Sequence, residues 1–145
     1  MYLSWSVAFF ISLISKFKQT KPKQHESGGV LLGQVKKNCI YITRISFPSS
    51  NDKSSRYSFW RNKKNAQSII DYEFYNSGGT VIYIGEWHTH PENHPSPSSI
   101  DINMIKTQFK KNKINETFLI MIIVGLKGYY FGFYDGENLY KLNKS

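Results

Sequence analysis

Two patterns of apolar residues alternate along this chain, and their order limits the fold more than any other feature of the sequence. Short apolar or β-branched runs, which are typical of strands, occupy residues 28–33, 40–46 and 80–87. Residues 63–77 and 98–113 instead place apolar side chains three and four positions apart, as amphipathic helices do. Strands interleaved with helices favour an α/β (or α+β) fold, in which helices pack on the faces of a central sheet.

The two ends of the chain extend this pattern. Near the start of the chain, apolar residues recur at the spacing of one helix face: Val7, Phe10, Ile11, Ile14 and Phe17. This spacing predicts a helix that packs on the core, and the apolar run is too short for a bilayer, which needs about 20 such residues. Near the end of the chain we expect closing antiparallel strands at residues 117–124, 129–134 and 138–142.

One segment, residues 47–61, follows neither pattern. It is polar, basic and rich in serine, so the sequence predicts a long surface loop, and loops of this length are often functional. Its stretch from Arg56 to Arg61 combines arginines with aromatic residues, which are enriched at protein interfaces. Two interpretations stay open: this stretch contacts a substrate tail, or it merely packs on the domain.

Length, cysteine content and charge narrow the class of protein. With 145 residues, the chain is expected to form a single domain over residues 1–145. The one cysteine, Cys39, excludes an internal disulfide framework and a cysteine-based zinc site, so we expect a cytoplasmic protein whose metal ligands are histidines and carboxylates. The net charge is +9, and no nucleic-acid-binding motif accompanies it. We interpret the charge as solvated basic faces that help to attract an acidic partner, and we expect binding to neither membranes nor nucleic acids.

The histidines point to a metal site. Three of the four lie within seven residues, and His88 and His90 are two positions apart at the end of an expected strand, so their imidazoles point to the same side. Asp101 follows in the first turn of a helix that Ser98 should cap, where the helix dipole favours a carboxylate. Two histidines and one carboxylate leave an open position on a tetrahedral zinc ion, which is typical of catalytic sites. His94 is interpreted as a surface-loop residue.

Such a site also needs a general base and an oxyanion donor. Glu26, which directly precedes the glycine-rich strand, is the leading candidate for the base, while Glu73, Glu86 and Glu92 remain alternatives. Ser98 can donate its hydroxyl group to the oxyanion that forms during hydrolysis.

The complete set of residues resembles the JAMM (JAB/MPN-plus) metallopeptidase family. The family is defined by a glutamate that is followed, further along the chain, by the motif His-x-His-Pro. Six residues then separate this motif from a second one, Ser-x-x-Asp. Here His88-Thr-His90-Pro91 is followed by six residues and then by Ser98-Ser-Ile-Asp101. The segment from Glu26 to Gly33 resembles the first motif of the family. The resemblance implies a cytidine-deaminase-like MPN/JAB fold with a mixed sheet, one zinc ion per chain held by His88, His90 and Asp101, and catalytic roles for Glu26 and Ser98.

The chain further resembles the bacterial JAB-domain proteins of CBASS anti-phage operons. This likeness implies an isopeptidase that cleaves after the C-terminus of a ubiquitin-like or otherwise conjugated protein, with E1/E2-like conjugation proteins and a nucleotidyltransferase as partners. Two alternatives stay open: C-terminal processing of a sulfur-carrier protein, and a basic nucleic-acid-associated JAB protein.

Overall fold

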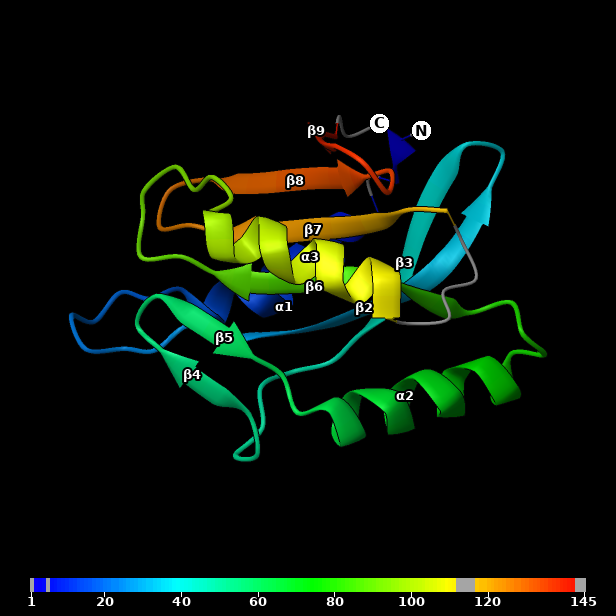
Figure 1. Ribbon diagram of the computed structural model, residues 1–145, viewed down its shortest axis with the longest axis horizontal. Helices are drawn as coiled ribbons and strands as arrows, with labels where there is room; N and C mark the ends of the chain where they lie inside the picture. Colours follow the sequence, from blue (N-terminus) through cyan, green and yellow to red (C-terminus); the bar gives the residue numbers. More distant parts are fainter. Residues whose placement is uncertain (1, 5, 112–116, 143–145) are drawn as a thin grey trace.

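The computed structural model describes residues 2–4, 6–111 and 117–142 (Figure 1). Within these ranges, the framework is a seven-stranded sheet in the order β1-β3-β2-β6-β7-β8-β9. The strands are β1 (Tyr2–Leu3), β2 (Gly28–Lys36), β3 (Cys39–Ile45), β6 (Ile82–Thr89), β7 (Leu119–Val124), β8 (Tyr129–Tyr134) and β9 (Leu139–Lys141). β1 runs parallel to β3 and β6 parallel to β7, whereas the other neighbours are antiparallel. The mixed sheet confirms the predicted α/β class.

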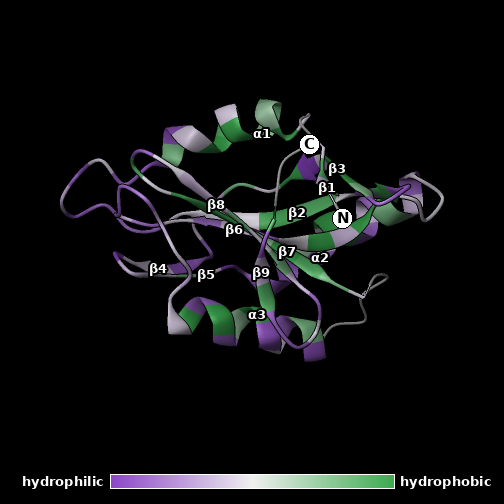
Figure 2. Ribbon diagram, turned by 90° about the horizontal axis from the view of Figure 1, so that it is seen from above, coloured by the Kyte–Doolittle hydropathy of each residue, from purple (hydrophilic) through white to green (hydrophobic). Residues whose placement is uncertain are grey.

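Helices cover both faces of the sheet (Figure 2). Helix α1 (Val7–Ile14), which continues into the 3-10 turn η1 (Ser15–Phe17), lies on one face. Helices α2 (Lys63–Asn76) and α3 (Ser99–Lys111) pack on the other face. The expected extension of α3 to Lys113 falls outside the described residues.

The buried strand β7 shows how the sequence builds two cores. Its residues alternate between the faces: Ile120 and Ile122 join the apolar cluster beneath α1, while Leu119, Met121 and Ile123 join the cluster beneath α2 and α3. Because both faces of this central strand are covered, every one of its residues is apolar and buried. The predicted apolar helices and strands are thereby confirmed in kind, with ends that differ by a few residues.

The prediction of a long surface loop at residues 47–61 was wrong in part. This segment contains a two-stranded hairpin, β4 (Lys53–Ser55) and β5 (Ser58–Trp60). The strands are short and mostly exposed, so they lack the apolar alternation by which strands are recognised. Phe59 supplies the buried anchor, since its ring packs directly on Gly28 at the start of β2. Strand β1 was also missed, because it has only two residues.

Gly85 sets the position of β6 within the sheet. Its φ angle is +157°, and a side chain at this position would overlap the carbonyl group of Ile120 on the neighbouring strand β7. The register with β2 also shifts here, between Leu31 and Leu32. A glycine therefore permits the close approach that aligns β6 with β7 and carries the strand to its end at Thr89.

Among the helices in the described ranges, none has the length and apolar character that crossing a bilayer requires.

Candidate metal centre

The two histidines lie where β6 ends beside the start of β2. His88 pairs with Gly28 across the antiparallel ladder. Thr89 extends the pairing, because its backbone N–H donates to the Ser27 carbonyl at 2.9 Å and its hydroxyl oxygen accepts from the Ser27 N–H at 3.0 Å. This pairing brings the segment that contains Glu26 to the two histidines.

Asp101 reaches the same place from the first turn of α3. The N–H of Ser98 donates to Asp101 Oδ2 at 2.8 Å, and the N–H of Asp101 donates to Ser98 Oγ at 3.2 Å. These reciprocal bonds close the helix N-terminus, so the Ser98-x-x-Asp101 spacing acts as a capping motif. Each carboxylate oxygen also faces one of the histidines: Oδ1 faces His88, and Oδ2 faces His90. Capping and metal binding are therefore compatible roles for Asp101.

The ligand atoms form a compact triangle. His88 Nε2 lies 3.1 Å from Asp101 Oδ1, His90 Nε2 lies 3.0 Å from Asp101 Oδ2, and the two Nε2 atoms are 3.2 Å apart. A tetrahedral zinc ion with bonds of about 2.0–2.1 Å separates its ligands by about 3.3 Å. Each of the three separations is close to this value, and the two to Asp101 end on different oxygens of its carboxylate.

Glu26 lies on the edge of this triangle. Its carboxylate is buried, at 4% exposure, and its nearest approach to the triangle is 3.9 Å, from Oε2 to His90 Nε2. Ligand atoms of Glu26, His88 and His90 all lie within 4.8 Å of one another, so this second set also has the composition of a metal site. Asp101 contacts both imidazoles more closely, which favours Asp101 as the third ligand and leaves Glu26 at the distance of a group that acts on a water molecule.

The carboxyl groups of the site differ in their protonation. Burial raises the pKa of Glu26 to about 8, and the charge of His90 only partly opposes this rise. Burial would also raise the pKa of Asp101, but hydrogen bonds from His88 and His90 outweigh it and hold that pKa well below its usual range. Asp101 is therefore an anion suited to metal binding, whereas Glu26 is able to hold a proton near neutral pH.

The remaining candidate bases have other partners. Glu73 pairs with Arg44, and Glu86 accepts hydrogen bonds from Arg61 and Tyr83. Glu92 lies next to the site, where its Oε1 is 2.9 Å from His90 Nδ1, on the opposite side of the ring from the triangle. Among these four candidate glutamates, all of which lie in the described ranges, Glu26 is the one that approaches His90 from its Nε2 side.

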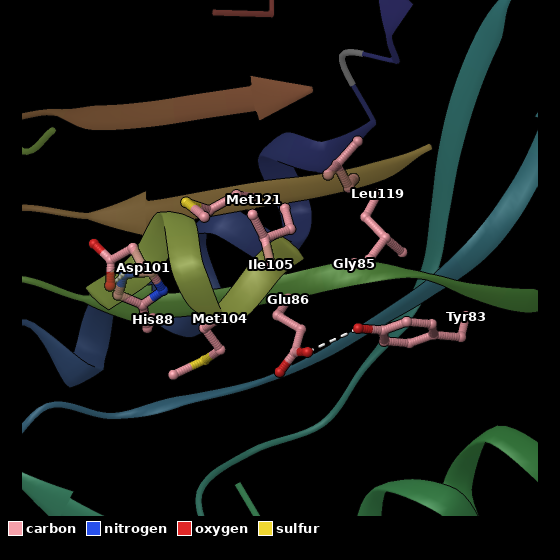
Figure 3. Close-up of a pocket in the computed structure, with 10 residues that line it drawn as sticks. Tyr83, Gly85, Glu86, His88, Asp101, Met104, Ile105, Leu119 and Met121 are labelled. Atoms are coloured by element: carbon pink, nitrogen blue, oxygen red, sulfur yellow. Dashed lines mark hydrogen bonds and ion pairs between the residues drawn. The ribbon is translucent and has the colours of Figure 1, made fainter. Parts of the chain in front are cut away.

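A small cavity borders the site beneath α3 (Figure 3). It is lined by His88 and Asp101 at one end and by apolar side chains such as Met104 and Met121. Its volume of about 20 Å³ is close to that of a single water molecule, so it cannot receive a peptide. A peptide substrate therefore has to reach the ligands by a route other than this cavity.

Sequence reasoning missed the supporting roles of two residues at the site. The first is Glu92, which was considered only as an alternative base. The second is the buried Gln19, whose Oε1 accepts from the Thr89 hydroxyl at 2.9 Å and whose Nε2 donates to the Arg56 carbonyl at 2.9 Å. Gln19 thus links the strand between the two histidines to the hairpin. The spacing of two positions between His90 and Glu92 was a usable signal, whereas nothing in the sequence relates Gln19 to Thr89.

Glu92 is expected to orient His90, because a metal-binding imidazole commonly donates its second N–H to a carboxylate. Replacing Glu92 with alanine should weaken zinc binding by about 10-fold or more. The measurement is competition for zinc against a chelator of known affinity, with the exposed Glu137→Ala as the matched control. An unchanged zinc affinity in E92A would show that the contact between Glu92 and His90 does not support the site.

Comparison with known proteins relates the chain to one family. The family model described as prokaryotic homologs of the JAB domain matches residues 12–134. A protein named CD-NTase/cGAS isopeptidase from Escherichia coli (strain TW11681) is 34% identical over 131 residues, which cover 90% of this chain and 81% of that protein. A protein of the same name from Vibrio cholerae is 32% identical, covering 84% and 76%. The solution structure of a protein from Desulfitobacterium hafniense is similar, with a TM-score of 0.65 and 15% sequence identity. The match covers 100% of this chain and 92% of that protein's chain, so the two share the fold.

Proposed function

The chain belongs to the prokaryotic homologs of the JAB domain, and we propose that it is a zinc-dependent isopeptidase that removes a conjugated protein from its target. The observation that carries the proposal is the triangle of His88, His90 and Asp101, with buried Glu26 beside it. This arrangement provides three zinc ligands, an open position and a proton acceptor, as hydrolysis of an amide bond requires.

Each residue then has a chemical role. His88, His90 and Asp101 would hold the zinc ion, which when bound would supply Lewis-acid chemistry by polarising a carbonyl oxygen and lowering the pKa of a water molecule. Glu26 accepts a proton from the attacking water at its carboxylate and passes it to the leaving ε-amine of the target lysine. The raised pKa of Glu26 suits this transfer, and a bound cation would lower it toward the working pH. Ser98 lies beside Asp101 and donates its hydroxyl to the oxyanion.

The substrate class follows from the relatives. These relatives are named CD-NTase/cGAS isopeptidase. We propose the same substrate class here: a nucleotidyltransferase, or a ubiquitin-like protein, joined through its C-terminus to a lysine by E1/E2-like enzymes. An extended C-terminal tail can bind along a strand edge through main-chain hydrogen bonds. The β4–β5 hairpin offers such an edge next to the site, since the Ser55 carbonyl accepts from the Glu26 N–H at 2.7 Å.

A cleavage assay with three substrates tests this function. The purified protein is incubated with a CD-NTase joined through its C-terminus to a target lysine, with a sulfur-carrier fusion, and with the same CD-NTase fused to a target through a linear peptide bond. We expect release of the CD-NTase from the lysine conjugate, loss of this activity with a zinc chelator, and recovery on adding zinc. Cleavage of only the sulfur-carrier fusion would favour that alternative, and activity that withstands chelation would contradict the metal mechanism.

A further inference from the structure

The net charge of +9 is left unexplained by the metal site, and its distribution is uneven. The first 51 residues contain Glu26 as their only carboxylate, and that carboxylate is buried inside the site. The same stretch carries four lysines close together, at positions 16, 18, 21 and 23. Their positive charge therefore has no carboxylate near in sequence on the protein surface to compensate it.

These lysines line one open hollow. Its volume is about 480 Å³, and its lining residues are Lys16, Lys18, Thr20, Lys21, Lys23 and Gln24. The side chains of Lys16, Lys21 and Lys23 belong to exposed residues, and none of the four lysines forms an ion pair with a described residue. We call this surface the lysine hollow. Like charges gathered around one concave surface raise the local potential and attract an anion.

The lysine hollow is fixed beside the metal site. Gln19, which lies between Lys18 and Thr20, is 2% exposed and accepts a hydrogen bond from Thr89, the residue between His88 and His90. Arg56 adds a second link, because its Nη1 donates to the Lys21 carbonyl at 3.1 Å from the hairpin turn. Figure 1 shows this blue loop at the same end of the molecule as the arrowhead of β6 and the β4–β5 hairpin.

The loop itself is held in shape by its own hydrogen bonds. The Gln24 side-chain amide donates to the Lys18 carbonyl at 2.9 Å, and its Oε1 accepts from the Lys21 N–H at 3.3 Å. Lys18 Nζ lies 5.5 Å from the centre of the Tyr129 ring, and Lys16 Nζ lies 5.4 Å from the centre of the Phe47 ring. The cations are therefore presented from a formed surface rather than from a free tail, which lowers the ordering cost of binding.

We propose that the lysine hollow binds an acidic polypeptide segment of the substrate, outside the scissile bond. The inference rests on the proposed function: a protein whose target bond occupies the metal site places its neighbouring surface at this end of the molecule. Lysine ammonium groups act as point charges for carboxylates. Lys16 Nζ lies within 5.5 Å of the ring centres of Phe17 and Phe47. Because the substrate of the proposed function is a protein, we favour an acidic polypeptide over a nucleic acid as the occupant.

A direct binding experiment tests the lysine hollow without requiring catalysis. The probe is fluorescein-labelled poly-L-glutamate, added to the chelator-treated full chain and followed by fluorescence anisotropy. The test variant combines Lys16→Gln, Lys18→Gln, Lys21→Gln and Lys23→Gln. The control combines Lys36→Gln, Lys110→Gln, Lys111→Gln and Lys141→Gln, four exposed lysines with the same total charge, of which Lys36 ends β2 at the opposite end of the sheet from the site. Thermal unfolding checks that both variants fold.

We expect the test variant to bind poly-L-glutamate at least about fivefold more weakly than the wild type, and the control to lose much less. Binding should also weaken with salt, because the screening length falls from about 10 Å at 0.1 M to about 3 Å at 1 M. Equal losses in both variants would overturn the proposal, since net charge alone would then explain binding. Tighter binding of a single-stranded oligonucleotide or of phosphatidylserine vesicles, lost in the same test variant, would also overturn it.

The same variants separate this proposal from the proposed function. With the lysine conjugate as substrate, poly-L-glutamate should compete and raise KM for the wild-type protein. If the conjugate is cleaved but the test variant shows neither weaker binding nor a changed KM, the proposed role of the lysine hollow is wrong and the proposed isopeptidase function is retained. If poly-L-glutamate binds to the lysine hollow but no conjugate is cleaved, the proposed function is wrong instead.

Discussion

Replacing Glu26 with glutamine is expected to slow cleavage of the conjugate by about 100- to 10,000-fold, the usual contribution of a general acid–base group. Glutamine has nearly the same shape but cannot accept and return a proton. The zinc ligands are left intact, because Glu26 approaches His90 Nε2 only to 3.9 Å, whereas Asp101 lies 3.0 Å from the same atom. The variant should therefore keep about one zinc ion per chain.

Two measurements on the same preparation check this expectation: the initial rate of cleavage and the zinc content by elemental analysis. The matched control is Glu137→Gln, which removes the same charge from an exposed residue between β8 and β9. A rate equal to that of the wild type would remove Glu26 from the mechanism. Loss of zinc in E26Q would instead indicate that Glu26 is a ligand, as the alternative set of Glu26, His88 and His90 would require.

The sequence predicted best what depends on neighbours along the chain. Helix α2 is an example, because Asn62 accepts a bond from the Asn65 N–H at its start and Gly78 and Gly79 adopt positive φ angles after its end. The capping motif at Ser98 and Asp101 is similar, since its hydrogen bonds span only three residues. Local spacing contains all the information that such features need.

The assembly of the site depends on contacts that local spacing does not describe. Ser27 and Thr89 are 62 positions apart, and the ladder between β2 and β6 joins them. The resemblance to the family predicted Glu26 at the site, because the family's motif combines residues from the two segments that this ladder brings together. Gln19 does not belong to the motif, so its hydrogen bond to Thr89 could be found only in the folded structure. The β4–β5 hairpin was missed for a related reason: Phe59 is its only buried residue.

Replacing Asp101 with asparagine is expected to remove zinc and to abolish most of the activity. Zinc in proteins is bound by histidine, cysteine and ionised carboxylates, and an asparagine amide is neutral. Loss of the metal removes several kcal/mol of stabilisation of the developing charge, and each 1.36 kcal/mol changes the rate by about tenfold, so cleavage should fall by about 1,000-fold or more. Asparagine is preferable to alanine here, because its carbonyl oxygen can still accept the hydrogen bond from the Ser98 N–H.

Zinc content, cleavage rate and thermal unfolding together distinguish the outcomes for D101N. The control is Asp71→Asn, which removes the same charge from an exposed residue of α2. Among the described residues, Asp101 alone forms ion-pair contacts with the Nε2 atoms of both histidines. Its replacement therefore leaves two imidazoles, 3.2 Å apart, without their shared carboxylate. A folded D101N protein that retained a full complement of zinc would contradict the assignment of Asp101 as the third ligand and would transfer that role to Glu26.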